Sequence, residues 1–152
     1  MKGFRSKKAI ALTTALTGLV ALVATSIALG FATSQGVLAD STTVNEVNFN
    51  LDPIKLRTKD SVRVRVVHTV RPGETVFGWH THPGPAIVTV VRGGFFITQG
   101  SCTPTWVPAG SAYIEEPGVP VTALSVGETE WITTLILPIG ADPAPPTSDP
   151  CS

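Results

Sequence analysis

The stretch GWHTHPGPAIVTVVRGG (78–94) decides the fold that we expect for this chain. Its Pro83-Gly84-Pro85 segment predicts a turn, because proline and glycine interrupt regular structure. A nearly continuous apolar run, Ile87–Val91, follows the turn and is typical of a strand covered on both faces. The residues before the turn, Val76–His82, are predicted to form a strand as well. This part of the chain is therefore expected to be β-structure.

Short strands are also predicted on both sides of this stretch. In SVRVRVVHTV (61–70), Val62, Val64, Val66, His68 and Val70 alternate with polar residues, and we expect this mainly apolar face to point inward. Further strands are predicted at Phe95–Gln99, Trp106-Val107, Ala112–Ile114, Val121–Val126 and Trp131–Leu137, with turns that include Arg92-Gly93-Gly94 and Gly127-Glu128-Thr129 between them. Such spacing predicts an all-β domain, an antiparallel sandwich or barrel.

The N-terminal part has the pattern of an export signal. Basic residues at 2, 5, 7 and 8 precede an uncharged run, and residues 9–32 are mostly apolar and are expected to form one helix. Val37-Leu38-Ala39 supplies the small residues that favour cleavage, which would remove residues 1–39 as a signal peptide. The run is also long enough to remain as a membrane anchor through residues 9–32. Either outcome predicts a protein that is secreted or held on the outer face of the cytoplasmic membrane.

The rest of the chain divides into three parts by composition. Residues 40–61 form a polar entry segment, 62–138 carry the predicted barrel, and 139–152 are a proline-rich tail. Residues 40–152 suffice for one domain and contain 7 basic and 11 acidic residues, a net charge near −4. That charge argues against a nucleic-acid partner, which would call for a basic surface.

Cys102 and Cys151 are the only cysteines of the chain. An even number of cysteines in an exported protein predicts a disulfide, and this one would tie the tail to the barrel. The alternative is a pair of free thiols. No histidine follows Cys102 in the sequence, which argues against a catalytic thiol.

His80 and His82 are the candidate ligands for a metal ion. Residues two apart on a strand point to the same face, about 7 Å apart along it, so two imidazoles can converge on one divalent ion such as Fe, Mn, Zn or Ni. The alternative is a pocket without metal, in which the imidazoles bind water or a small molecule. Neither a nucleophile motif of the GxSxG type nor a glycine-rich phosphate loop is present.

The histidine pair and its surroundings resemble the cupin superfamily. Its first motif is matched by His80 and His82 with Gly94 at the later spacing, and Pro108-Ala109-Gly110 is similar to the Pro-x-Gly turn of its second motif. The chain is most similar to small exported cupins with a WHxHPGP segment, a CTP segment and a cysteine near the C-terminus. The resemblance covers about residues 62–138 and implies an antiparallel double-stranded β-helix, a jelly-roll barrel that often forms homodimers.

Two ligands of the cupin pattern are missing. The usual glutamate falls on Ala86 or Ile87, and the histidine of the second motif falls on Tyr113 or, with a longer turn, near Val121. A third ligand would therefore come from elsewhere, and the candidates are Glu115, Glu116, His68 and Tyr113. Trp79 and Tyr113 are the predicted pocket residues.

These observations leave three functions open. The first is an exported barrel that binds a metal ion or small molecule at His80 and His82 without proven catalysis. The second, implied by the cupin resemblance, is a metal-dependent oxygenase or isomerase acting on a small organic molecule, with Glu115 or Glu116 as the carboxylate ligand. The third is a structural or interaction module at the cell surface.

Overall fold

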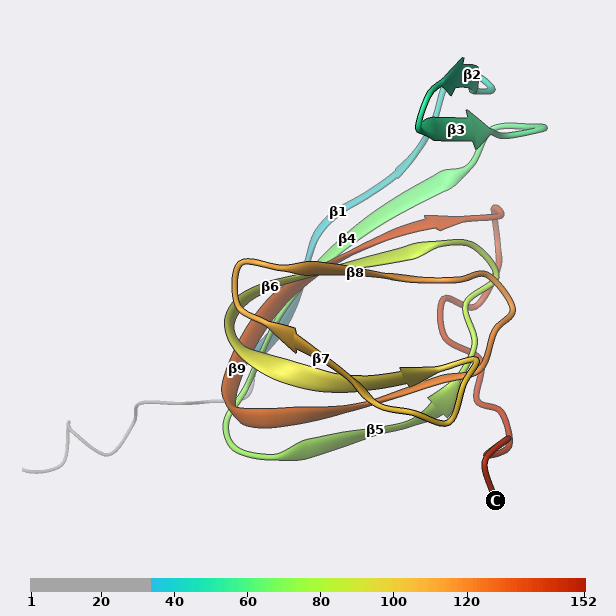
Figure 1. Cartoon of the computed structure of the whole chain (residues 1–152). Coiled ribbons are helices and arrows are strands. Elements are labelled where there is room, and N and C mark those ends of the chain that lie inside the picture. Colours follow the sequence, from blue (N-terminus) through green and yellow to red (C-terminus); the bar gives the residue numbers. More distant parts are fainter. Residues whose placement is uncertain (1–33) are drawn as a thin grey trace, which may run out of the picture. The chain divides into compact units, whose positions relative to one another are not determined.

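A computed structural model describes residues 34–152, and these residues form an all-β domain (Figure 1). Its strands are β1 (Ser34–Thr42), β2 (Asn48–Leu51), β3 (Ile54–Arg57), β4 (Arg63–Arg71), β5 (Thr75–His80), β6 (Ala86–Gln99), β7 (Thr105–Pro108), β8 (Ala112–Glu115) and β9 (Val121–Leu137). No helix of this part of the chain is long and apolar enough to cross a membrane. The helix predicted over residues 9–32 lies outside the described residues.

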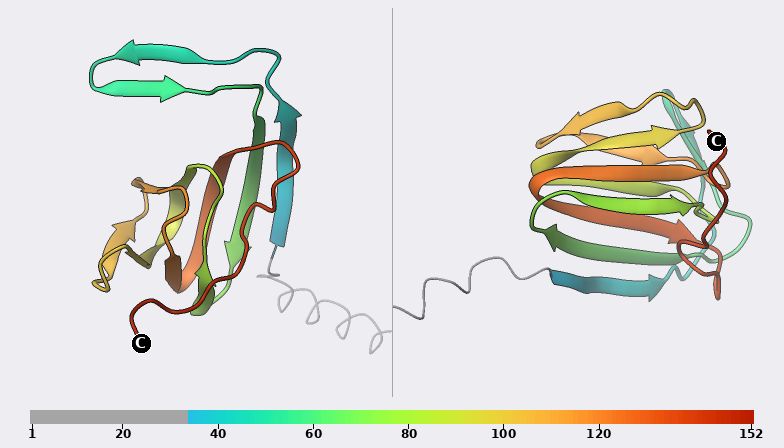
Figure 2. Two further views of the ribbon diagram at one scale, coloured as in Figure 1. Left: turned by 90° about the vertical axis from the view of Figure 1, so that its right-hand side faces the viewer. Right: turned by 90° about the horizontal axis from the view of Figure 1, so that it is seen from below.

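Seven of the strands form one antiparallel sheet that curls into a barrel (Figure 2). The strand order is β1-β4-β9-β6-β7, with β5 added beside β9 and β8 beside β6. The first part of β9 pairs with β5 and its last part with β4, while β6 pairs with β8 near its start and with β7 further along. Each of these long strands therefore belongs to both halves of the barrel.

Two predicted turns are bends inside these long strands. Arg92-Gly93-Gly94 lies within β6, where the pairing with β9 shifts register, and Gly127-Glu128-Thr129 lies within β9. Gly93 and Gly127 have φ values of 73° and 64°, a conformation that glycine adopts without steric cost. Such irregularities bend a strand while the pairing resumes beyond them. The prediction of a chain reversal at these two points was wrong.

The inward face of β4 is opposite to the one we predicted. Val67 and Thr69 are buried, whereas Val66 and His68 lie on the outer face and are only partly covered. The alternation was misleading because the outer face of the sheet is itself rich in β-branched residues. The inward row also carries Arg65, a charged residue that lines the cavity described below.

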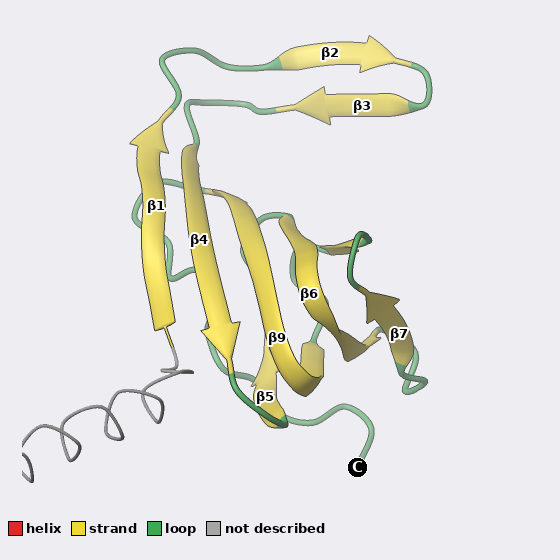
Figure 3. Ribbon diagram, turned by 90° about the vertical axis from the view of Figure 1, so that its left-hand side faces the viewer, coloured by secondary structure: helices red, strands yellow, loops and turns green. Residues whose placement is uncertain are grey.

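The predicted entry segment contains regular structure. Strand β1 pairs antiparallel with β4 from Ser34↔Val70 to Thr42↔Arg63, so six residues ahead of Asp40 take part in the edge of the sheet (Figure 3). Strands β2 and β3 form a separate two-stranded hairpin between β1 and β4. The pattern of polar residues had not predicted these three strands.

The core fills the interior of the barrel with aliphatic and aromatic side chains. Phe77, Phe95 and Trp131 meet edge to face, with ring centroids 4.7–6.2 Å apart. Such aromatic pairs add about 0.5–1.5 kcal/mol each beyond their area burial. The buried members of the main cluster are Val88, Val90, Phe95, Ile97, Val107, Val121 and Trp131. Four of its members, Val88, Phe95, Ile97 and Trp131, also line the cavity described below.

Candidate metal centre

The structure brings His80, His82 and Glu115 together. His80 is the last residue of β5, His82 follows in the connection to β6, and Glu115 ends β8. One ligand atom from each residue lies within 4.8 Å of the other two, and the imidazole centroids are 4.8 Å apart. Since β5 ends at His80, the pair is not two residues of one strand, as predicted, but a strand end and its following loop.

Backbone carbonyls fix the orientation of both imidazoles. Nδ1 of His80 lies 2.7 Å from the Gly78 oxygen, and Nδ1 of His82 lies 2.6 Å from the Pro143 oxygen. Because a carbonyl only accepts, each Nδ1 carries the proton and each Nε2 keeps its lone pair in the neutral ring. Histidine ligands of metals commonly donate their other N–H in this way. Both rings are thus prepared to offer Nε2 to an ion.

His82 and Glu115 form a buried, close pair. Their Nε2 and Oε2 atoms are 2.8 Å apart, and their side chains are only 6 % and 7 % exposed. The contact lacks the geometry of a hydrogen bond, so the buried Nε2 has no hydrogen-bond partner among the described residues. An unsatisfied buried nitrogen costs about 1–3 kcal/mol, and a bound ion would satisfy it.

The charge state of His82 reflects opposing effects. Burial disfavours the charged imidazolium, but contact with the Glu115 carboxylate, the bond to the Pro143 carbonyl and the negative charge of Glu115 together raise the pKa of His82 above its ordinary value. Without a bound metal, the charged form of His82 therefore stabilises the folded protein at pH values below the ordinary pKa of histidine. That contribution is lost as the pH rises through the raised pKa of His82.

The donor set fits a divalent metal ion. Two imidazole nitrogens and one carboxylate are the ligands of non-haem Fe(II) sites and of many catalytic zinc sites. The orphaned Nε2 of His82 and the buried carboxylate of Glu115 are what an ion would join. Glu115 lies opposite Ala86 in the pairing of β8 with β6, and Ala86 is one of the two positions on which the glutamate of the cupin pattern falls.

The C-terminal tail runs beside the histidine pair. The Thr81 N–H donates to the Pro145 carbonyl and the Thr147 N–H donates to the Trp79 carbonyl, both at 3.0 Å. His80 and Pro146 form an isolated antiparallel bridge, and Cys102–Cys151, the predicted disulfide, joins the end of the tail to the β6–β7 connection. The sequence indicated the disulfide but not the carbonyl that orients His82.

A cavity of about 240 Å³ adjoins the three candidate ligands. Most of its lining residues are apolar or aromatic, and several are polar or charged: Gln35, Arg65, Val67, Thr69, Phe77, His80, His82, Val88, Phe95, Ile97, Glu115, Ala123, Trp131, Thr133, Leu135, Pro143 and Ala144. Small-molecule sites of this kind are concave and apolar, with few polar groups.

The predicted pocket residues Trp79 and Tyr113 do not line this cavity. Tyr113 packs against the hydrophobic core, and burial, together with the charges of Glu115 and Glu116, raises the pKa of its phenol. Trp79 contacts the tail through its backbone carbonyl. The aromatic residues Phe77 and Trp131 line the cavity instead.

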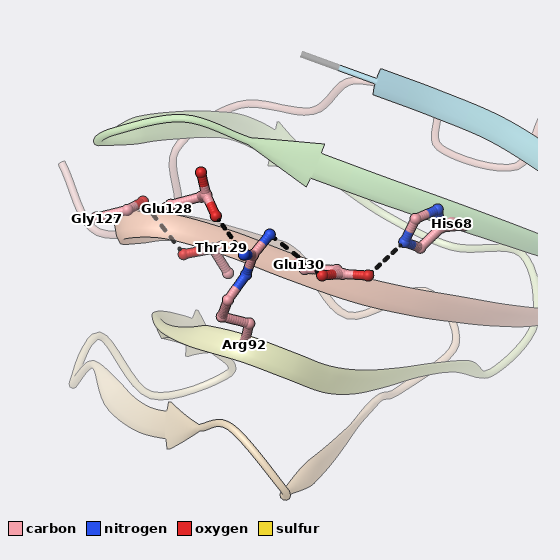
Figure 4. Close-up of polar contacts among 6 residues, drawn as sticks. All are labelled: His68, Arg92, Gly127, Glu128, Thr129 and Glu130. Atoms are coloured by element: carbon pink, nitrogen blue, oxygen red, sulfur yellow. Dashed lines mark hydrogen bonds and ion pairs between the residues drawn. The ribbon is translucent and has the colours of Figure 1, made fainter. Parts of the chain in front are cut away.

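His68 and Glu116, two candidate third ligands, lie away from the centre. Nε2 of His68 is 2.9 Å from Glu130 Oε1, in a network of ion pairs that continues through Arg92 to Glu128 (Figure 4). Because His68 is on the outer face of β4, it cannot reach His80 or His82. Glu116 is exposed, since neighbouring residues of a strand end point in opposite directions. Of the candidate carboxylates, Glu115 is the one that lies beside His80 and His82.

The comparisons with known proteins concern the fold. A conserved protein with a double-stranded β-helix domain from Klebsiella pneumoniae is similar over 76% of this chain and 85% of its own, with 18% identity and a TM-score of 0.52. A cupin-like protein from Thermotoga maritima is similar over 57% of this chain and 65% of its own, just under two thirds, with 22% identity and a TM-score of 0.50.

A cupin superfamily protein from Desulfitobacterium hafniense is similar over 64% of this chain and 78% of its own, with 7% identity and a TM-score of 0.47. No protein-family model matches the sequence, and no curated protein matches it. The likenesses with TM-scores of 0.52 and 0.50 support the antiparallel barrel formed by the seven-stranded sheet. The described residues of this chain therefore have the fold of the cupin superfamily, the double-stranded β-helix.

Proposed function

We propose that this protein binds one divalent metal ion through His80, His82 and Glu115 and holds a small organic molecule in the adjoining cavity. The observation that carries the proposal is the buried Nε2 of His82, which lacks a hydrogen-bond partner and lies 2.8 Å from the buried Glu115 carboxylate. Fe, Mn, Zn and Ni all suit imidazole and carboxylate ligands.

Each residue has a distinct part in this proposal. His80 and His82 offer Nε2, and the carbonyls of Gly78 and Pro143 hold their rings in place. Glu115 supplies a negative charge that offsets part of the charge of the cation. The apolar wall excludes water from the space beside the ligands, which strengthens every electrostatic interaction there.

A second candidate function is a metal-dependent oxygenase or isomerase of a small organic molecule. The observation that favours it is that the cavity adjoins a set of only three protein ligands, which is the arrangement of catalytic rather than structural sites. A bound ion would supply a Lewis acid able to polarise an oxygen of the substrate. The chain itself would bind and orient that substrate against Phe77 and Trp131.

An extracytoplasmic location is part of the proposal. Disulfides persist mainly in oxidising compartments, and Cys102–Cys151 is such a bond. The basic and apolar residues that begin the sequence support the same location.

Metal analysis of protein expressed with export intact tests the proposal. Elemental analysis of the purified protein should give about one equivalent of metal, and Glu115→Gln should reduce the affinity about 10–100-fold or more. Glu116→Gln is the matched control, because it makes the same change at the exposed neighbour and should leave the metal content unchanged. A wild-type protein without metal that takes up none of the four ions on titration would refute the proposal.

A further inference from the structure

We propose that the cavity takes a small organic acid whose anionic group is bound by the Arg65 guanidinium. This inference rests on the proposed function and deepens it, because it names the chemical class of the molecule that would lie beside the three candidate ligands.

Arg65 shares the inner face of the barrel with Glu115. In the paired strands, Arg65 of β4 lies opposite Leu135 of β9, Leu135 opposite Ala86 of β6, and Ala86 opposite Glu115 of β8. Residues directly opposite each other in antiparallel strands project to the same face. The row thus places a cation at one side of the cavity and the candidate ligand Glu115 at the other, and both line the cavity.

The Arg65 guanidinium keeps donors that an anion could use. Asp40 is its only carboxylate neighbour among the described residues, and both oxygens of Asp40 accept hydrogen bonds from Arg63 at 2.6 Å. Arg65 reaches the same carboxylate only at 3.6 Å and donates no hydrogen bond within residues 34–152. The guanidinium groups of Arg63 and Arg65 therefore share the single carboxylate of Asp40. The positive charge that Asp40 does not neutralise is that of Arg65, which lines the cavity.

The remaining walls fit an apolar body behind that anionic group. Val67 and Leu135 line the cavity near Arg65, and Trp131 lines it four residues further along the paired strands. The volume of about 240 Å³ lies below the roughly 300–1,000 Å³ usual for small-molecule sites. The ligand is therefore small. Guanidinium binds carboxylate through two parallel hydrogen bonds, a pairing with geometric specificity that an uncharged amide cannot reproduce.

Calorimetric titration with matched acids and amides tests this inference. The probes are benzoate against benzamide and hexanoate against hexanamide, which differ mainly in charge. The wild-type protein should bind each acid about tenfold or more tightly than its amide, a difference of about 1.4 kcal/mol. Arg65→Gln should abolish that preference by weakening the binding of the acids. The matched control is Arg71→Gln, because Arg71 is on the same strand, does not line the cavity and should not matter.

A bound metal would also attract a carboxylate, so each titration is made on metal-free and metal-loaded protein with the metal content measured. Equal binding of acid and amide by the wild type, an acid preference that survives Arg65→Gln, or no binding of any probe at about 10 mM overturns the inference. Failure of the metal centre shows separately: protein that takes up no metal but loses its acid preference in Arg65→Gln refutes the proposed function and retains this inference.

Discussion

The Nδ1 atom of His82 donates a hydrogen bond of 2.6 Å to the carbonyl of Pro143, a residue 61 positions further along the chain. The contact makes the orientation of a candidate metal ligand depend on the C-terminal tail. The tail is held in turn by the disulfide between Cys102 and Cys151. Stability and metal affinity should therefore both respond to changes far from the histidine pair in sequence.

Removal of the disulfide should loosen the tail and weaken metal binding. Cys102→Ser with Cys151→Ser opens a loop with a sequence separation of 49, which on the chain-entropy model costs about 4 kcal/mol of unfolding free energy. Metal affinity should fall about tenfold or more, as is usual when the hydrogen-bond partner of a histidine ligand is lost. Denaturant titration and metal-competition titration measure the two effects. Unchanged metal affinity in the folded double variant would show that the tail does not support His82.

Gly84→Ala should destabilise the protein because the backbone there has no space for a side chain. A Cβ atom at Gly84 would overlap the carbonyl oxygen of Ile136 in β9. Displacing the β5–β6 connection from β9 should cost about 1–3 kcal/mol, and it should move His82, two residues away. Gly78→Ala is the matched control, since a Cβ at that position meets no atom within 4 Å. Chemical denaturation of both variants checks the prediction, and equal stability of the two would contradict it.

Acidification should remove the contribution of Asp40. The hydrogen bonds from Arg63, together with the positive charges of Arg63 and Arg65, outweigh desolvation and lower the pKa of Asp40 below 3.8. A carboxyl whose pKa is lower in the folded state stabilises the protein at pH values above its unfolded pKa. This stabilisation declines as the pH falls from about 4 through the lowered pKa. Asp40→Asn should therefore reduce the unfolding free energy at pH 7 but not at pH 2. A difference between the two proteins that is constant from pH 7 to pH 2 would refute the pairing.

The residue at which the folded chain begins should affect the stability of the sheet. Residues 34–39 pair with Val66–Val70 of β4, and Gln35 lines the cavity. A chain that begins at Asp40, as cleavage after Ala39 would produce, should be less stable than one that begins at Ser34 by a few kcal/mol, at about 0.5–1.5 kcal/mol per net hydrogen bond. Thermal unfolding of the two chains measures this, and intact mass measurement of the exported protein locates the natural start. Equal melting temperatures would show that residues 34–39 of β1 contribute nothing to stability.

Much of the fold could be predicted from local sequence patterns. Turn residues such as Pro83-Gly84-Pro85 and the apolar run Ile87–Val91 identified strands and their ends, because these features act over a few residues. The bends at Gly93 and Gly127 were predicted as turns, because glycine is common both in turns and at bends within strands. Only the strand pairing, which continues on both sides of these residues, separates a bend from a turn. The face of β4 was assigned wrongly because valines occupy both sides of that strand.

The candidate site could be predicted only in part. The spacing of His80 and His82 identified two candidate ligands, and the position of Glu115 after the second turn made it one of several candidates for the third. Choosing Glu115 over Glu116 requires the pairing of β8 with β6, which sets the direction of each side chain. The role of Pro143 could not be foreseen, because its backbone carbonyl has no distinguishing mark in the sequence.

The tail also links the candidate centre to the redox state of the chain. Cys102 and Cys151 form a disulfide, and disulfides persist mainly in oxidising surroundings. A reduced chain lacks this tether for the segment whose Pro143 carbonyl orients His82. Firm binding of an ion at the proposed centre is thus expected to follow oxidation of the two thiols, and a reducing environment would weaken it.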